Sequence, residues 1–180
     1  MLKRETQLLP DAKWKALQLC IPITCVDVLL IREVNKSTFE IGLIYRNTPH
    51  QGRRWCLIGG RLFLNEPLRD AVARQVHDAI GKHARCILPA NLQPLFIAEY
   101  FSKRVSGSLF DPRKHAIGLT FVVQIQGQTQ PQGEAIDFRW FTLDQLPNSK
   151  YFGFGQRKVV FECIQRFELA DGCGWVQSNR

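Results

Sequence analysis

The sequence lacks the cysteine and histidine spacings that bind structural zinc. Its six cysteines form no CxxC pair, and its four histidines do not lie at zinc-ligand spacing from them. This argues against a zinc-stabilised fold. Cys20 and Cys56 lie in apolar surroundings, so we expect buried thiols at both positions. A signal peptide is also lacking, and a reducing cytoplasm is therefore the expected location.

Long hydrophobic runs are lacking as well. The apolar stretch 17–31 is interrupted by Gln18 and Asp27 and is too short to span a bilayer, so no membrane segment is expected. Acidic residues are the minority: 16 Asp and Glu stand against 24 Lys and Arg, which gives a net charge of +8. A basic chain favours anionic partners such as nucleotides and nucleotide-sugars. Because the basic residues are scattered, nucleic acid is the less expected partner.

What is present is the composition of one ordinary globular domain of 180 residues, with 45% hydrophobic and 22% charged residues. Strands before and after one long helix, followed by a closing helix, predict an α/β fold in which helices cover a mixed sheet. Apolar β-rich runs predict the strands at residues 23–32, 39–46, 92–103, 115–126 and 136–141, with a polar loop at 47–54. Helical spacing predicts helices at 11–19, 67–80 and 156–169, and a short helix capped by Thr142.

The chain is organised around a glycine pair, residues 59–60, that precedes the long helix. Asn65 is the expected N-cap, Pro67 lies near the first helical position, and Gly81 is placed to end the helix. A glycine pair before a capped helix indicates a site for a phosphate-bearing ligand. One side of the helix is apolar and should face a core, through Leu68, Val72, Val76 and Ile80.

This segment resembles the Nudix box, Gly-x5-Glu-x7-Arg-Glu-apolar-x-Glu-Glu-x-Gly. Three glutamates of the box are replaced here, by Gln75, Asp78 and Ala79. The resemblance implies a Nudix-type α/β/α sandwich with a mixed sheet over residues 23–169, preceded by an N-terminal extension, in one domain spanning residues 1–180. The box positions that match are Gly60, Glu66, Arg74, Val76 and Gly81.

The resemblance is strongest to the GDP-mannose hydrolases, which cut at the sugar carbon rather than at phosphorus. Thr48-Pro49-His50-Gln51-Gly52 precedes Trp55 as a related motif does in that branch, and Arg46 and Arg61 fall on its matching arginines. Two departures stand out. Ala79 replaces the glutamate that this branch keeps as a metal ligand, and Ala135 replaces the histidine proposed there as the general base.

The resemblance implies the following roles. Mg²⁺ or Mn²⁺ would be held by Gly60, Asp78 and Glu134, and Glu66 and Arg74 would form a structural ion pair that ties the loop to the helix. His115, Asp27 and Arg61 are the candidate catalytic residues, and Arg46, Arg61 and Asp27 are expected to bind substrate. A homodimer is also implied by this branch. Independently, a carboxyl group at Asp27 is costly to bury within an apolar strand, so it should meet an arginine or a substrate group.

Three functions remain open from the sequence. The first is a Mg²⁺-dependent hydrolase of a nucleoside-diphosphate sugar resembling GDP-mannose, which would release sugar and nucleoside diphosphate. The second is a catalytically impaired Nudix-type module that binds a nucleotide-sugar or a partner without turnover. The third is a pyrophosphohydrolase, for which Gln75 and Ala79 are the most unfavourable substitutions.

Overall fold

A computed structural model describes residues 9–35 and 38–171, with side chains over 9–35 and 39–167. Its centre is one nine-stranded mixed sheet that runs in the order β3-β2-β1-β8-β6-β7, to which β4, β5 and β9 are added. The strands are β1 (Ile23–Asn35), β2 (Thr38–Thr48), β3 (Gly52–Cys56), β4 (Ile58–Arg61), β5 (Arg85–Ile87), β6 (Phe96–Phe101), β7 (Leu109–Phe110), β8 (Ala116–Gln126) and β9 (Asp137–Phe141). The α-helices are α1 (Asp11–Cys20), α2 (Leu68–Ile80) and α3 (Arg157–Asp171).

Strand β1 is the long central strand that joins the parts of the sheet. It pairs in parallel with β8 from Ile23↔Ala116 to Ile31↔Gln124. Its other edge changes partner along its length: β4 pairs with residues 25–28, and β2 pairs from residue 30 onward, both antiparallel. The mixed sheet predicted from the sequence is therefore confirmed.

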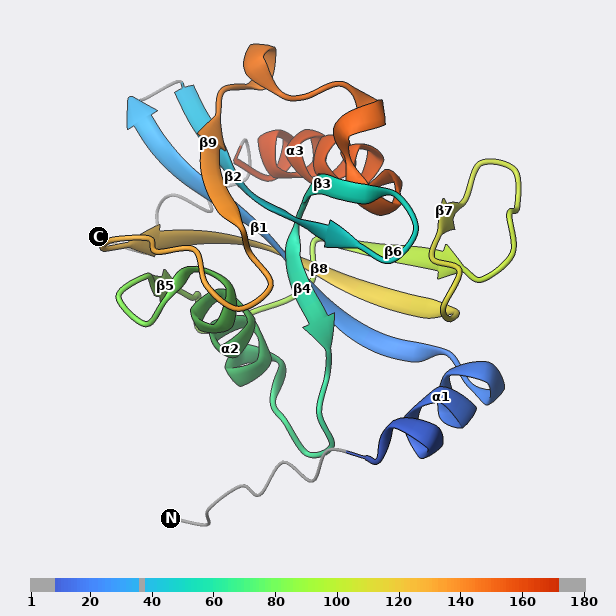
Figure 1. The fold of residues 1–180 in the computed structure, drawn as a ribbon. Coiled ribbons are helices and arrows are strands. Elements are labelled where there is room, and N and C mark those ends of the chain that lie inside the picture. Colours follow the sequence, from blue (N-terminus) through green and yellow to red (C-terminus); the bar gives the residue numbers. More distant parts are fainter. Residues whose placement is uncertain (1–8, 36–37, 172–180) are drawn as a thin grey trace.

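Helices cover both faces of this sheet (Figure 1). Leu29 and Ile31 of β1 line a hollow beneath α3, together with Cys163 and Phe167 of that helix. Successive strand residues point to opposite faces, so the fully buried Val28 lies on the other side, where α2 packs against β1, β4 and β5. The predicted α/β/α sandwich is confirmed, and the odd-numbered residues of β1 lie on the α3 side.

Helix α2 forms where the apolar spacing predicts it. Val72, Val76 and Ile80 are completely buried, and Gly81 ends the helix with a φ of 89°, a conformation that favours glycine. The predicted N-cap at Asn65 is wrong. Pro67 occupies that position, while Asn65 has a φ of 58° within the preceding turn, a conformation that asparagine tolerates better than most residues do.

Three further local predictions are corrected by the structure. The expected polar loop 47–54 is mostly strand, because the Thr48 hydroxyl donates to the Gly52 carbonyl (2.8 Å) and thereby closes a tight turn between β2 and β3. Cys20 is exposed at the end of α1, although Cys56 is buried as expected. The predicted helix after Thr142 is a 3₁₀ turn over Leu143–Gln145, and the Thr142 side chain makes no capping hydrogen bond.

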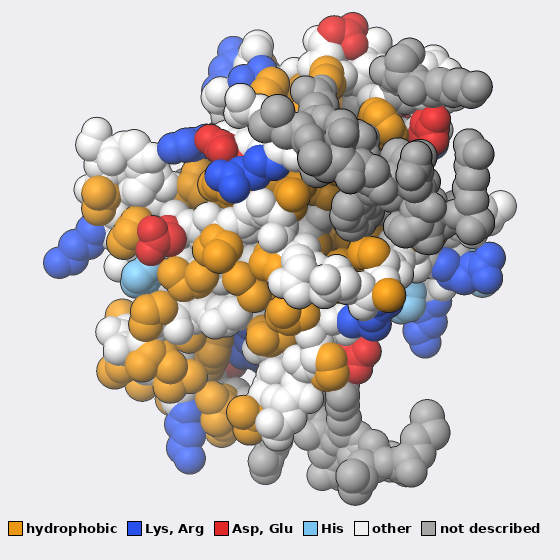
Figure 2. All heavy atoms as spheres, turned by 180° about the vertical axis from the view of Figure 1, so that it is seen from behind, with side chains coloured by type: hydrophobic (Ala, Val, Ile, Leu, Met, Phe, Trp, Pro, Cys, Tyr) orange, Lys and Arg blue, Asp and Glu red, His pale blue; other side chains and the backbone are white. Residues whose placement is uncertain are grey.

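The back of the molecule has a broad hydrophobic area with basic residues dispersed around it (Figure 2). Large hydrophobic side chains that are exposed on the molecule include Leu19, Ile21 and Ile97. The positive charge is therefore distributed over this described face rather than concentrated in one stripe. None of the helices in the described ranges is long and apolar enough to cross a membrane.

Candidate active site

A polar cleft of about 200 Å³ opens at the end of the sheet where β1 begins. It is smaller than the roughly 300–1,000 Å³ of a typical small-molecule pocket, so it can enclose the reacting part of a substrate rather than a whole nucleotide-sugar. Gly59 and Gly60 form part of its wall. Six charged residues line it, three acidic and three basic: Asp27, Asp111, Glu134, Arg46, Arg113 and Lys114.

Asp27 lies at the base of this cleft and is 7% exposed. The Tyr100 hydroxyl donates a hydrogen bond to Asp27 Oδ2 at 3.1 Å, and Gln156 Nε2 donates to the Tyr100 oxygen at 3.2 Å. The amide oxygen of Gln156 accepts the backbone N–H of Leu57 at 3.0 Å. Within the protein Asp27 is thus hydrogen-bonded to a tyrosine rather than to an arginine, one of the two partners expected for it, and a buried hydrogen-bonded chain fixes the position of the carboxyl group.

Two glycines make room for the Asp27 carboxyl group. A Cβ at Gly59 would lie 2.3 Å from Asp27 Oδ1, and a Cβ at Gly118 would lie 2.6 Å from Oδ2. Any larger residue at either position would displace the carboxyl group, since real Cβ atoms do not approach so closely. The backbone of β4 and β8 therefore shapes the pocket around this one side chain.

Burial raises the pKa of Asp27 to about 6, even though the Tyr100 hydrogen bond and the positive charges of Lys114 and Arg46 favour the ionised form. A carboxyl group with a pKa near neutrality can accept and release a proton at physiological pH. Asp27 therefore combines burial and a pKa near neutrality with a place in the lining of the cleft.

Replacing Tyr100 by phenylalanine is expected to raise the pKa of Asp27 by about one unit, because the hydroxyl that stabilises the carboxylate is removed. The Asp27 carboxyl carbon, followed by ¹³C NMR during a pH titration, reports this directly. Tyr151→Phe, at a half-exposed tyrosine, is the control and should leave the titration unchanged. An unchanged pKa in the Tyr100→Phe variant would show that the hydroxyl does not stabilise the carboxylate.

The three cations of the cleft have different partners. Arg46 Nη1 forms an ion pair with Glu134 Oε1 at 2.6 Å, and Arg113 pairs with both oxygens of Asp111 at 2.9 and 2.7 Å. Within the described ranges, Lys114 makes no ion pair, and its Nζ lies 3.8 Å from the Cys25 sulfur.

The cysteines of the cleft are not suited to nucleophilic catalysis. Burial raises the pKa of Cys25 to about 11 and that of Cys56 to about 12. Both are therefore neutral thiols at physiological pH, and the thiolate is the reactive form.

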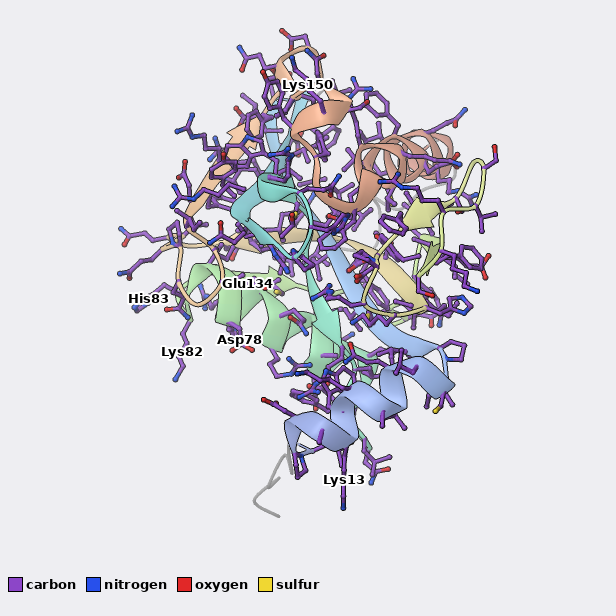
Figure 3. All side chains as sticks on the ribbon, turned by 45° about the vertical axis from the view of Figure 1, so that its right-hand side comes forward. Lys13, Asp78, Lys82, His83, Glu134 and Lys150 are labelled. Atoms are coloured by element: carbon purple, nitrogen blue, oxygen red, sulfur yellow. The ribbon has the colours of Figure 1, made fainter. Side chains whose placement is uncertain are left out.

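Both carboxylates that were expected to hold Mg²⁺, those of Asp78 and Glu134, lie beside arginines rather than beside each other's oxygens in a metal-binding group. Asp78 has a side chain that is 67% exposed and lies 3.7 Å from Arg74 Nη1, while Ala79 is 3% exposed and offers no donor atom. The Glu134 carboxylate is already paired with Arg46. Figure 3 shows Glu134 in the loop above α2 and Asp78 on the helix itself. No group of three His, Cys, Asp or Glu side chains able to hold a metal ion occurs in the part of the chain that the structure describes.

The other predicted catalytic residues lie outside this cleft. The Arg61 guanidinium stacks on the Trp14 ring of α1 at 4.4 Å from the ring centroid. His115 stacks on Phe101 at 4.8 Å and lines a second hollow beside the end of α1, which shares Arg113 and Lys114 with the cleft. Asp27, Arg46, Glu134 and Gly60 thus line one cleft, whereas Arg61, His115 and Asp78 are not among the residues that line it.

Glu66 and Arg74 form the ion pair expected from the box pattern. Arg74 Nε and Nη2 donate to the two Glu66 oxygens at 2.6 and 2.8 Å, and Nη2 also donates to the Arg61 carbonyl at 3.1 Å. The Phe63 N–H donates to Glu66 Oε2 at 3.0 Å. These bonds join the turn after β4 to the middle of α2.

Among the residues that line the cleft, sequence reasoning does not select Tyr100, Asp111, Arg113, Lys114 and Gln156 as site residues. Arg113 and Lys114 are adjacent basic residues in the sequence, but their place near the start of β1 follows from the parallel pairing of Ile23 with Ala116. Gln156 carries no local signal, since its amide group bonds to Leu57 and Tyr100, which are distant in sequence.

Comparison with known proteins gives a family and a fold. A family model described as a domain of unknown function (DUF4916) matches residues 5–159. No curated protein matches the sequence.

Solved structures give the fold. The chain is similar to a structure from Jonesia denitrificans DSM 20603 described as a possible asymmetric diadenosine tetraphosphate hydrolase, with 27% identity and a TM-score of 0.74 over 82% of this chain and 95% of that one. It is also similar to the Nudix domain of Shewanella oneidensis NrtR in complex with ADP-ribose, with 17% identity and a TM-score of 0.62 over 88% and 99% of the two chains. A MutT Nudix hydrolase from Burkholderia pseudomallei matches at 19% identity and a TM-score of 0.59, over 79% and 98% of the two chains. The fold is that of the Nudix hydrolases.

Proposed function

This chain belongs to the family described as a domain of unknown function (DUF4916), and from that premise and its Nudix fold we propose that it hydrolyses a nucleoside-diphosphate derivative in the cleft above Asp27. The proposal rests on one observation. A buried carboxyl group with a pKa near neutrality lines the same cleft as three cationic side chains. A general base and a site for phosphate are the two elements that such hydrolysis requires. One structural neighbour is described as a possible diadenosine tetraphosphate hydrolase and another is in complex with ADP-ribose, and both compounds belong to this class.

Among these substrates we place nucleoside-diphosphate sugars first, with GDP-mannose as the member that the resemblance of residues 46–61 suggests. Asp27 would take a proton from water while the water oxygen bonds to the sugar carbon. The bond from that carbon to the phosphate oxygen breaks, and the electron pair leaves with the diphosphate. The negative charge that develops there would be stabilised by Arg46 and Lys114. A diphosphate is a good leaving group from this carbon, so no acid is needed to protonate it.

A second candidate is a module that binds a nucleotide derivative without turnover. The replacement of the box glutamates at Gln75 and Ala79 favours it, because these positions carry metal-binding carboxylates in the Nudix pattern. The Nudix domain in complex with ADP-ribose illustrates a ligand of this type. Cleavage at phosphorus remains the third candidate.

Product analysis distinguishes the three candidates. The protein is incubated with GDP-mannose, a UDP-sugar, ADP-ribose or diadenosine tetraphosphate, each with Mg²⁺, Mn²⁺ or EDTA. Release of free sugar and nucleoside diphosphate is the expected result. Sugar phosphate with nucleoside monophosphate would indicate cleavage at phosphorus, and binding without product would indicate the module. Size-exclusion chromatography of the same sample tests the homodimer that the resemblance implies.

Replacing Arg46 by methionine is expected to lower kcat/KM about 10²-fold, the scale of removing one charged donor from a developing anion. Arg53→Met is the matched control, since Arg53 is an exposed arginine of the neighbouring strand that does not line the cleft. Equal kinetics for Arg46→Met and wild type would show that the substrate does not bind in this cleft, and would contradict the proposal.

A further inference from the structure

We infer that this cleft binds the diphosphate of its ligand with side-chain cations alone, Lys114 being the primary contact, and that no divalent metal ion is needed for binding. The inference rests on the proposed function, since it concerns the same cleft, and it adds the groups that hold the ligand. Lys114 is assigned this role by its place in the lining of the cleft and because no carboxylate of the described residues forms an ion pair with it.

The first step concerns what the box substitutions do to the charge of the site. Carboxylates that hold a metal ion would repel a diphosphate if the metal were removed. Here two of those positions are uncharged, at Gln75 and Ala79, and the carboxylate of Asp78 is 3.7 Å from Arg74 and mostly exposed. The substitutions therefore remove two of the carboxylates that would bind the metal, together with the negative charge that they would place near a diphosphate.

The second step concerns Lys114, which precedes β8 and lies near the first residues of β1. Its ammonium group lies in the cleft at 3.8 Å from a neutral thiol, that of Cys25, and makes no ion pair with any residue of the described ranges. Its charge lowers the pKa of Asp27 and of Cys25 against the effect of burial, which shows that its field reaches the base of the cleft. An unpaired ammonium group in a cleft is available to a phosphate at once.

The third step concerns the two arginines, which are less available. Arg113 is held by both oxygens of Asp111, a carboxylate whose residue is only 4% exposed, so this pair should stay intact. The Glu134 side chain is 46% exposed and can turn into water, which would free Arg46 for a phosphate oxygen. Glu134 is therefore a competitor of the ligand rather than a metal ligand, and its removal should strengthen binding.

Calorimetric titration of the full chain with GDP and with ADP, in EDTA and then in Mg²⁺, tests the inference. We expect the Kd in EDTA to lie within about threefold of the Kd in Mg²⁺. Lys114→Met should weaken binding at least tenfold, the effect of losing one charged hydrogen bond, and Lys114→Arg should retain most of it. Glu134→Gln should tighten binding several-fold. Lys82→Met is the control, because Lys82 is exposed at the end of α2 and points away from the molecule (Figure 3).

The outcomes separate this inference from the proposed function. Binding that requires Mg²⁺, or that weakens in Glu134→Gln, would make Glu134 a metal ligand and overturn the inference while leaving the function in place. Equal binding by Lys114→Met and wild type would overturn the role of Lys114. No binding of GDP or ADP in either buffer would refute the proposed function, and the inference with it. Circular dichroism confirms that each variant is folded.

Discussion

Replacing Asp27 by asparagine is expected to lower kcat by about 10²–10⁴-fold, the usual contribution of a positioned general base. Asparagine has almost the same shape, and its amide oxygen can still accept the Tyr100 hydroxyl at the Oδ2 position. The variant therefore removes the proton acceptor with little change in the packing of the cleft. The measurement is single-turnover product release on the best substrate of the panel. A variant that keeps more than about a tenth of the wild-type rate would show that the base lies elsewhere.

Asp27→Asn is also expected to change the free energy of unfolding. Near neutral pH it should stabilise the protein, by an amount that depends on pH. The pKa of Asp27 is about 6 in the folded chain against an ordinary value of 3.8, because burial disfavours the ionised form. Between these two values the folded state keeps a proton that the unfolded state has lost, so the stability from this group declines as the pH rises through 6. A gap of about two pH units corresponds to about 3 kcal/mol in the free energy of unfolding.

We therefore expect the wild type to lose about 2 kcal/mol relative to Asp27→Asn between pH 4 and pH 7.5, because the unfolded state is already partly ionised at pH 4; urea unfolding of both proteins measures this loss. Subtracting the two curves removes the titration of all other groups. Asp144→Asn, at an exposed aspartate, is the control and should show no such trend. A flat difference between wild type and Asp27→Asn would mean that the carboxyl group titrates normally.

Replacing Arg74 by methionine should lower the free energy of unfolding by about 3–5 kcal/mol, the cost of removing one partner from a buried ion pair. The Glu66 side chain is only 7% exposed, and it receives two hydrogen bonds from Arg74. Methionine can fill much of the space of the arginine stem but cannot compensate the negative charge of the Glu66 carboxylate. The link from α2 to the Arg61 carbonyl would be lost as well.

Chemical unfolding of Arg74→Met, Glu66→Gln and the double variant measures this effect and its origin. The double variant should be more stable than the sum of the single losses predicts, because the uncompensated charge is removed together with its partner. Arg85→Met, at an exposed arginine, should change the free energy of unfolding by less than about 0.5 kcal/mol. A loss below about 1 kcal/mol for Arg74→Met would show that the pair behaves like a surface contact.

The parts of the fold that sequence reasoning predicted are those that local pattern determines. Local sequence is enough to predict β1 and β8 from their apolar runs. It is also enough to predict α2 from the spacing of Val72, Val76 and Ile80. Strand β3 was missed because it contains Arg53 and Arg54 and lies at the end of the sheet path, where charged residues are tolerated.

The same contrast between local pattern and long-range packing applies to the residues of the candidate site. Asp27 was found because a carboxyl group within an apolar strand is costly unless it is used. Arg46 and Glu134 came from the family resemblance, but the ion pair between them depends on how the β8–β9 loop folds back, which no local pattern shows. Tyr100 and Gln156 were missed because ordinary tyrosines and glutamines are common in strands and helices, and only long-range packing brings them to Asp27.

The parallel pairing of β1 with β8 also determines when the cleft can exist during synthesis of the chain. Residues 23–31 can pair early with β2 and β4, but they gain their parallel partner β8 only after residues 116–124 have left the ribosome, and contacts between such distant segments form slowly. Until then the Asp27 carboxyl group has neither Gly118 nor Tyr100 in place, since Tyr100 reaches it through the pairing of β6 with β8. A nascent chain that ends before residue 116 thus carries the whole box and its helix but has no pocket in which a ligand could bind.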